Sequence, residues 1–162
     1  MESQVEYILI TGGAGFIGSN YLNQFAGAGE VHYVNLDKLT YAGSLSNIHI
    51  PQEAPYTFVE GDICDAPLLN ELFEKYSFTK VLHFAAESHV DNSISGPEIF
   101  IDTNIRGTFN LLEVARRLWL EQPHKLKREY QQARFLHVST DEVYGSLGPT
   151  GLFTEKTAYA PN

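Results

Sequence analysis

Glycines stand three positions apart in the segment TGGAGFIG, which follows a short apolar run near the start of the chain. At Gly12, Gly15 and Gly18 the chain can turn tightly and bring bare backbone against a pyrophosphate. A helix expected to begin near Gly15 would point its N–H groups and positive dipole end at the phosphates. Because GxxGxxG differs from the more common GxGxxG, an ordinary structural turn explains these glycines equally well when they are taken alone.

An acidic residue at the end of the next expected strand favours a dinucleotide. Asp37 lies about 20 residues past the last glycine, where a carboxylate can accept hydrogen bonds from the adenosine ribose hydroxyls. Such an acid repels a 2′-phosphate and so favours NAD over NADP, a preference that neighbouring Lys38 reduces. The GxxxxGK[ST] phosphate loop is excluded, because its lysine would stand where this chain has Ser19.

Polar segments also follow the third and fourth expected strands. Asp62 in EGDIC could meet an adenine amino group, and a turn or helix-capping role explains it equally well. In HFAAESHVD, Ala85 and Ala86 would let a flat cofactor lie close above a strand's carboxyl end, where ligands of open α/β sheets bind. The polar residues that follow, Glu87, Ser88, His89 and Asp91, could serve this site or only solvate a loop.

The segment HVSTDEVYG places two adjacent carboxyl groups after the fifth expected strand. Asp141 and Glu142 can differ in pKa, so that one serves as an acid and the other as a base, and elimination of water needs both roles. Residues 139–142 also fit the S-x-x-E capping box of a helix. Gly145 and a loop rich in glycine and proline follow almost at once, so no helix is expected there.

Short runs of β-branched and aromatic residues alternate with longer segments of helical spacing, which predicts an α/β fold with a doubly wound parallel sheet, truncated after the fifth strand. The expected strands are Tyr7 to Thr11, Val31 to Leu36, Tyr56 to Glu60, Lys80 to Phe84 and Arg134 to Ser139. Helices are expected from near Gly15, over 66–76 and over 97–120. The last has Phe100, Ile101, Ile105, Phe109, Leu112 and Leu118 roughly on one side. Residues 39–55 and the charged segment 120–132 are expected to be loops.

Composition narrows the class of protein. A chain of 162 residues, 43% hydrophobic, is long enough for one compact domain. Its net charge of -9 argues against nucleic-acid and anionic-membrane partners. The single cysteine, Cys64, requires no oxidising compartment, so a cytoplasmic location is expected. Histidine, cysteine and acidic residues show no credible metal-ligand spacing, so no metal is expected.

Taken together, these motifs resemble the extended short-chain dehydrogenase/reductase family and, within it, the dTDP-glucose 4,6-dehydratases. The resemblance covers essentially the whole chain, through ILITGGAGFIGS, NLDKLTYAG, GDICD, HFAAESHVD, TNIRGT, LLEVAR, STDEVYG and FTEKTAYAPN. It implies a Rossmann-type NAD-binding domain over residues 1–162. It also implies a nucleotide-sugar substrate, dTDP-glucose, that is oxidised at C4, loses water across C5 and C6, and receives the hydride back at C6.

The resemblance also implies roles for individual residues. Glu142 would remove the C5 proton, Asp141 would protonate the departing C6 hydroxyl, and Thr140 and Ser88 would face the sugar. The implied cofactor shell comprises Gly12, Gly15, Phe16, Ile17, Gly18, Asp37, Lys38, Leu39, Thr40, Asp62, Ile63, Phe84, Ala85, Ala86, Glu87, Ser88 and Thr103. The helix ending near Leu120 would pack against a second subunit, which makes the full-length protein a homodimer.

One departure from the family lies at the end of the chain. The family's YxxxK motif, whose tyrosine deprotonates the C4 hydroxyl, is expected a few residues after TAYAPN, and the chain ends at Asn162. Neither Tyr144 nor Tyr159 has a lysine four positions on. The fragment is therefore expected to be an incomplete domain without turnover. The alternatives are another nucleotide-sugar dehydratase, an epimerase, a decarboxylase, or a non-catalytic NAD-binding module; an aspartate at position 141 favours the dTDP-glucose enzymes.

Overall fold

A five-stranded parallel sheet forms the centre of the computed structural model, which describes residues 5–161. Its strands are β1 (Tyr7–Thr11), β2 (His32–Asp37), β3 (Tyr56–Glu60), β4 (Lys80–His83) and β7 (Arg134–His137), in the order β3-β2-β1-β4-β7. Every neighbouring pair in this sheet is parallel. The predicted Rossmann-type sheet is confirmed, with some strand ends displaced by one or two residues.

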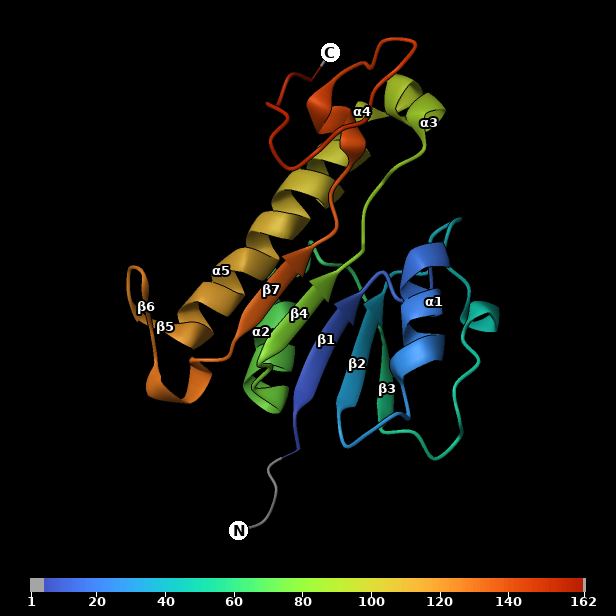
Figure 1. Ribbon diagram of the computed structural model, residues 1–162. Coiled ribbons are helices and arrows are strands. Elements are labelled where there is room, and N and C mark those ends of the chain that lie inside the picture. The colour runs from blue at the N-terminus through green and yellow to red at the C-terminus, as the bar shows by residue number, and fades with distance from the viewer. Residues whose placement is uncertain (1–4, 162) are drawn as a thin grey trace.

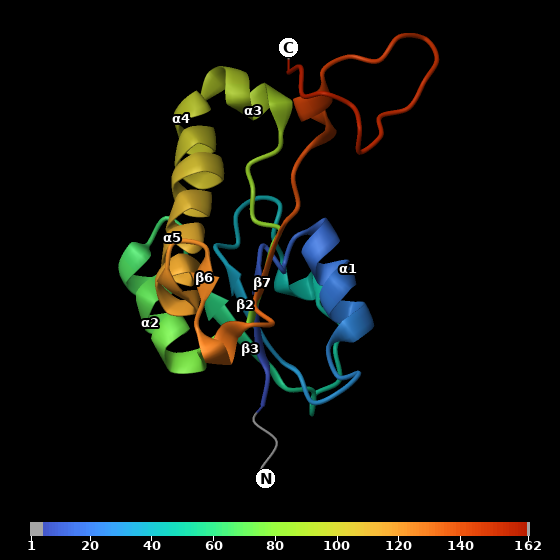
Figure 2. The ribbon, with the colours of Figure 1, turned by 60° about the vertical axis from the view of Figure 1, so that its left-hand side comes forward.

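Helices cover both faces of the sheet (Figures 1 and 2). Helix α1 (Phe16–Phe25) lies on one face, while α2 (Ala66–Tyr76) and α5 (Thr108–Trp119) lie on the other. This arrangement follows from the parallel pairing, because each crossover between parallel strands must pass over a face. The larger core cluster joins the sheet to α2 and α5, and a smaller one joins it to α1. All five carboxyl ends therefore open at one edge.

Local signals in the sequence account for the bounds of α2. Asp65 caps its N-terminus, accepting a hydrogen bond from the N–H of Leu68 at 3.0 Å, and a proline follows in the first turn. Ser77 ends the helix in the left-handed conformation, with its N–H bonded to the carbonyl of Phe73. The buried side chains Leu69, Leu72 and Phe73 follow the spacing of one helical face.

The long helix expected over 97–120 begins as α4 (Pro97–Phe100), continues through a π-helical segment η2 (Ile101–Gly107) and ends as α5. A short helix α3 (Val90–Ser95) precedes it. Most of the apolar side noted in the sequence does not face the sheet, because Ile101, Ile105, Phe109 and Leu112 are exposed, whereas Leu118 packs against the larger core cluster. The residues of α5 that are buried are Leu111, Val114, Ala115 and Trp119.

Two segments expected to be loops contain short elements. Residues 39–55 include the 3-10 turn η1 (Leu45–Asn47). Residues 120–132 form a small hairpin of β5 (Leu120–Gln122) and β6 (Lys125–Leu126), followed by η3 (Arg128–Tyr130). After β7 comes η4 (Asp141–Tyr144), where the sequence predicted no helix. Within residues 5–161, no helix is long and apolar enough to cross a membrane.

Candidate functional site

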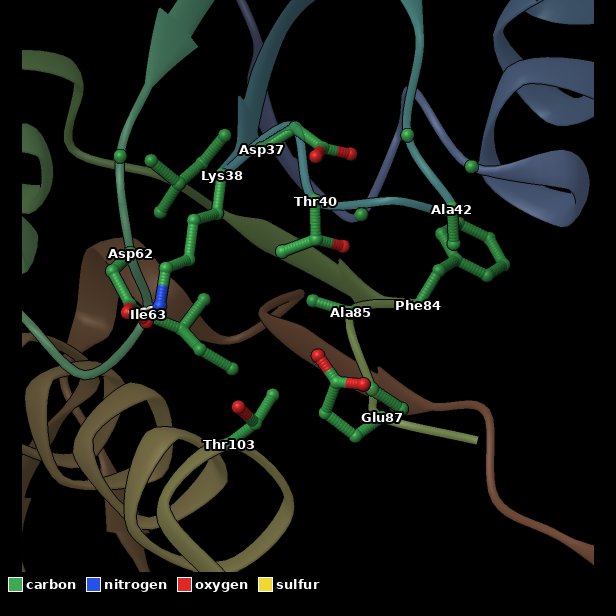
Figure 3. A pocket seen from close by; sticks show the side chains of 16 residues that line it. Asp37, Lys38, Thr40, Ala42, Asp62, Ile63, Phe84, Ala85, Glu87 and Thr103 are labelled. Carbon is green, nitrogen blue, oxygen red and sulfur yellow. Dashed lines mark ion pairs between the residues drawn. The ribbon is translucent and has the colours of Figure 1, made fainter. Parts of the chain in front are cut away.

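A cleft opens at the carboxyl edge of β1, β2 and β4, where the sequence places the glycine-rich turn (Figure 3). It is lined by Gly12, Gly15, Leu36, Asp37, Lys38, Thr40, Ala42, Gly43, Gly61, Asp62, Ile63, Phe84, Ala85, Ala86, Glu87 and Thr103. Most of the residues proposed from the sequence for a cofactor are thus brought together. The residues not foreseen are Leu36, Ala42, Gly43 and Gly61. The proposed residues that do not line the cleft are Phe16, Ile17, Gly18, Leu39 and Ser88.

The glycine-rich turn lies so close to its neighbours that side chains are excluded. Gly12 has a φ of 72°, and a Cβ there would lie 2.5 Å from the backbone nitrogen of Ala85. A Cβ at Gly18 would collide with the carbonyl oxygen of Gly12. Among the described residues, no side chain caps the first turn of α1, which leaves its positive end available to an anion.

Two buried side chains of β2 hold this turn in place. The Asn35 Oδ1 accepts the N–H of Gly13 at 3.1 Å, and its Nδ2 donates to the Tyr56 hydroxyl at 3.0 Å. The Asp37 Oδ2 accepts the N–H of Ala14 at 2.8 Å. Asp37 therefore already binds the turn in addition to its proposed contact with a ribose. Asn35 was missed from the sequence, and its signal was a polar residue in the middle of an apolar strand.

Asp62 does not cap α2, since Asp65 does so. Its Oδ1 accepts the N–H of Cys64 at 2.8 Å, and its Oδ2 lies 2.6 Å from the ammonium of Lys38. The carboxylate thus stays at the rim of the cleft (Figure 3). Burial, reinforced by Asp62, raises the pKa of the Cys64 thiol to about 11, so this cysteine stays a thiol near neutral pH.

The segment after β4 is held in place by hydrogen bonds to the π-helical segment η2 and to β1. Asn104 accepts the N–H of Glu87 and donates to its carbonyl, both at 2.8 Å. The resemblance included Asn104 in TNIRGT, but no contact with the segment after β4 was expected of this side chain. Beneath the same segment, His83 lies between the hydroxyls of Thr11 and Thr108, at 2.6 and 2.9 Å. His83 thereby fixes the Thr11 hydroxyl, which lies 3.5 Å from the backbone nitrogen of Ala85 in the cleft floor.

The carboxyl pair Asp141 and Glu142 lies in η4 and is exposed. Thr140 caps this turn, because its hydroxyl accepts the N–H of Glu142 at 3.2 Å. The capping interpretation thus holds for Thr140 rather than for Ser139. The C-terminal segment folds back on the turn, since the N–H of Ala160 donates to the carbonyl of Val143 at 3.0 Å. Asp141 and Glu142 follow β7 at the same edge of the sheet as the glycine-rich turn.

One Y-x-x-x-K match occurs elsewhere, at Tyr76 to Lys80. Tyr76 ends α2 and Lys80 begins β4, so both lie at the amino edge, opposite the cleft. The ammonium of Lys80 is paired with Glu6 at 2.8 Å. This pair therefore cannot act on a ligand at the cleft. Over residues 5–161, no group of three or more histidine, cysteine or acidic side chains is placed to hold a metal ion.

Known proteins similar to this chain are nucleotide-sugar enzymes. The dTDP-glucose 4,6-dehydratase of Xanthomonas campestris pv. campestris (strain B100) is 52% identical over 155 residues, which cover 95% of this chain and 43% of that protein. The enzyme of Salmonella typhimurium is 48% identical, with 96% and 45% covered. The chain thus spans less than half the length of these relatives.

Two solved structures, a dTDP-glucose 4,6-dehydratase and a UDP-glucose 4-epimerase, share this fold. The dTDP-glucose 4,6-dehydratase of Bacillus anthracis in complex with NAD aligns with a TM-score of 0.76 at 41% identity, covering 98% of this chain and 45% of that one. A UDP-glucose 4-epimerase of Thermus thermophilus, also with NAD, aligns equally well at 26% identity, with 96% and 44% covered. The resemblance to dTDP-glucose 4,6-dehydratases is confirmed. Because the model of the family described as GDP-mannose 4,6 dehydratase matches residues 9–162, the chain belongs to that family.

Proposed function

We propose that this chain is the NAD-binding part of a dTDP-glucose 4,6-dehydratase, a lyase of nucleotide-sugar metabolism. The observation that carries the proposal is the cleft at the carboxyl edge, where a glycine-rich turn, an unblocked helix N-terminus and Asp37 meet. These are the groups that a pyrophosphate and an adenosine ribose require. The relatives named dTDP-glucose 4,6-dehydratase support the same assignment.

The residues present fit a dinucleotide. At Gly12 and Gly15 the cleft is lined by backbone without side chains, and Asp37 and Asp62 provide carboxylate acceptors at its rim. Phe16 and Ile17, whose side chains are exposed, would contribute their backbone N–H groups at the start of α1. When bound, NAD+ supplies the hydride acceptor for oxidation of the sugar. Ala85 and Ala86 would form a flat floor for the cofactor.

The proton chemistry would fall to the residues after β7. Glu142 would remove the C5 proton of the sugar, while Asp141 would protonate the departing C6 hydroxyl. Thr140 uses an oxygen lone pair for the N–H of Glu142, so its hydroxyl proton remains free to donate to the substrate. Ser88 would face the sugar from the segment after β4. These roles are carried over from the resemblance.

Cofactor binding and turnover can be tested separately. Calorimetric titration of the purified chain with NAD should give saturable binding, and Asp37→Ala should weaken it at least tenfold, because the turn and the ribose both lose an acceptor. In the full-length protein, Glu142→Gln and Asp141→Asn should each lower kcat by about 10²–10⁴-fold with little change in NAD affinity. Unchanged kcat in both variants would refute the proposed proton transfers.

An epimerase is the second candidate, because UDP-glucose 4-epimerases align with TM-scores as high as 0.76 and 0.77. The fold alone does not separate the two activities. Sequence identity favours the dehydratase, at 41% against 26% and 27% for those epimerases. The products differ: a dehydratase converts dTDP-glucose into a 4-keto-6-deoxy sugar, whereas an epimerase inverts C4 and retains the C6 hydroxyl. NMR of the product of the full-length protein distinguishes them.

The exposed apolar stripe on the long helix supports a homodimer of the full-length protein. Ile101, Ile105, Phe109 and Leu112 follow one another on the side of the helix that faces away from the sheet, and each is at least 48% exposed. Contiguous apolar surface of this type is typical of subunit contacts. Phe109→Glu should therefore give a monomer in light scattering. Leu152→Glu, at an even more exposed apolar position outside the stripe, should leave the dimer intact.

A further inference from the structure

An ion pair joins an acidic and a basic residue at the rim of the cleft. The ammonium of Lys38, directly after β2, lies 2.6 Å from the Oδ2 of Asp62, which stands two residues after β3 (Figure 3). Both residues line the cleft, and both side chains are only partly exposed, at 50% and 29%. The positive charge of Lys38 is therefore already matched within the protein.

A second hydrogen bond, to the other oxygen of Asp62, orients its carboxylate toward Lys38. The backbone N–H of Cys64 donates to Oδ1 at 2.8 Å, which fixes the carboxylate so that Oδ2 faces Lys38. Burial alone would raise the pKa of Asp62, but the hydrogen bonds from Lys38 and Cys64 lower it. The bond to Asp62 raises the pKa of Lys38. Both groups stay charged at neutral pH, so the pair persists there.

The position of Lys38, next to Asp37, bears on whether the cleft accepts a 2′-phosphate. In dinucleotide sites a carboxylate at the end of the second strand accepts the ribose hydroxyls, whereas a free basic residue nearby accommodates a 2′-phosphate. This chain has both, since Asp37 is followed directly by Lys38. A lysine neutralised by Asp62 offers little attraction to the phosphate, and Asp37 repels it.

We propose that Asp62 is a specificity-determining residue, which holds Lys38 in an ion pair and so keeps the cleft selective for NAD over NADP. The inference rests on the proposed NAD site and deepens it. In it, Asp62 acts on the cofactor through Lys38, in addition to any contact of its own with the adenosine. Removing the negative charge at position 62 would release Lys38 toward a 2′-phosphate.

The test compares NAD and NADP affinities by calorimetric titration of the purified protein, freed of bound nucleotide. Asp62→Asn preserves an oxygen for the Cys64 N–H but removes the charge. The Kd for NADP divided by the Kd for NAD should fall about two- to fivefold, the scale of one partly exposed charge pair. Using the ratio cancels any general weakening of both cofactors. The double variant Asp62→Asn/Lys38→Ala should return the ratio to that of the wild type.

A matched control is Asp65→Asn, which makes the same change three residues further on, outside the cleft, at a cap position that asparagine also suits. It should leave the ratio unchanged. Should Asp62→Asn not fold, Asp62→Ser serves instead, because a serine hydroxyl can accept the same N–H.

The outcomes separate the inference from the function on which it rests. Wild-type protein that binds no NAD overturns the proposed function. Wild-type protein that binds NAD, with an unchanged ratio in a folded position-62 variant, overturns the role of Asp62 alone. A ratio that falls equally in the double variant also overturns it, because Lys38 would then not be the group released.

Discussion

His83 makes the stability of this protein depend on pH in a way that can be measured. Its ring lies in the core, 1% exposed, between Thr11 of β1 and Thr108 of α5. Burial, with the facing ring of His137 centred 5.0 Å away, lowers the pKa of His83 from 6.5 to about 4. A neutral imidazole donates through one nitrogen and accepts through the other, and a hydroxyl can take either role. The native state therefore holds this histidine uncharged.

The sign of the effect follows from the direction of the shift. Between about pH 6.5 and 4 the unfolded chain binds a proton at His83 that the folded protein refuses, so stability falls as pH falls through that window. A shift from 6.5 to about 4 corresponds to about 3 kcal/mol, at about 1.4 kcal/mol for each pH unit. About 2 kcal/mol of this should be lost already by pH 5.

Urea unfolding at several pH values, followed through the single buried Trp119, measures this loss. Between pH 7 and 4 the wild type should lose about 3 kcal/mol more than His83→Gln, which cannot take up the proton. His49→Gln, a change at an exposed histidine in the loop before β3, is the matched control, and its loss should follow the wild type. Equal losses in all three proteins would refute the reasoning. An NMR titration of the His83 ring tests the same pKa without a substitution, and a value near 6.5 would contradict it.

Two further variants test the turn and the core. Gly12→Ala places a Cβ against the Ala85 backbone at a positive φ, so it should lower the unfolding free energy by more than about 1 kcal/mol and weaken NAD binding at least tenfold. Gly29→Ala, where a Cβ meets nothing within 4 Å, should do neither. Trp119→Phe removes the 2.7 Å hydrogen bond to the Phe78 carbonyl and should cost about 1–3 kcal/mol in urea unfolding followed by circular dichroism. A loss below 0.5 kcal/mol, on the order of an exposed substitution, would show that this bond adds little.

The strands could be predicted because each is a short apolar run bounded by turn residues. β1 and β3 occupy the expected residues, since the apolar run and the hydrogen-bonded ladder end together. β4 and β7 were expected to extend into the residues that follow them. After β4 the backbone leaves the regular ladder at Phe84, which lines the cleft, although its N–H still donates to the Thr11 carbonyl at 2.9 Å. Such ends depend on neighbouring strands, which a single segment does not reveal.

In the long helix, hydrophobic periodicity did not identify which side packs on the sheet. Two sides of it are apolar: one packs on the sheet through Leu111 and Trp119, and the other, with Ile105 and Phe109, is exposed. Hydrophobic spacing cannot distinguish a side covered by the protein's own core from one that is exposed at its surface. The π-helical turn at 101–107 adds to the difficulty, because its wider spacing shifts every later side chain around the axis.

The carboxylate of Asp37 shows a different limit of prediction from the sequence. The sequence places Asp37 at the edge where a ribose would bind, but it cannot show which lone pairs remain. In the structure its two oxygens accept the N–H groups of Ala14 and Leu39, both at 2.8 Å. An ionised carboxylate has about four acceptor sites, so about two remain for ribose hydroxyls. Binding then needs no rearrangement of Asp37, since the contacts that fix the glycine-rich turn also aim the carboxylate. A change at this residue should therefore disturb the turn and the ribose contact together.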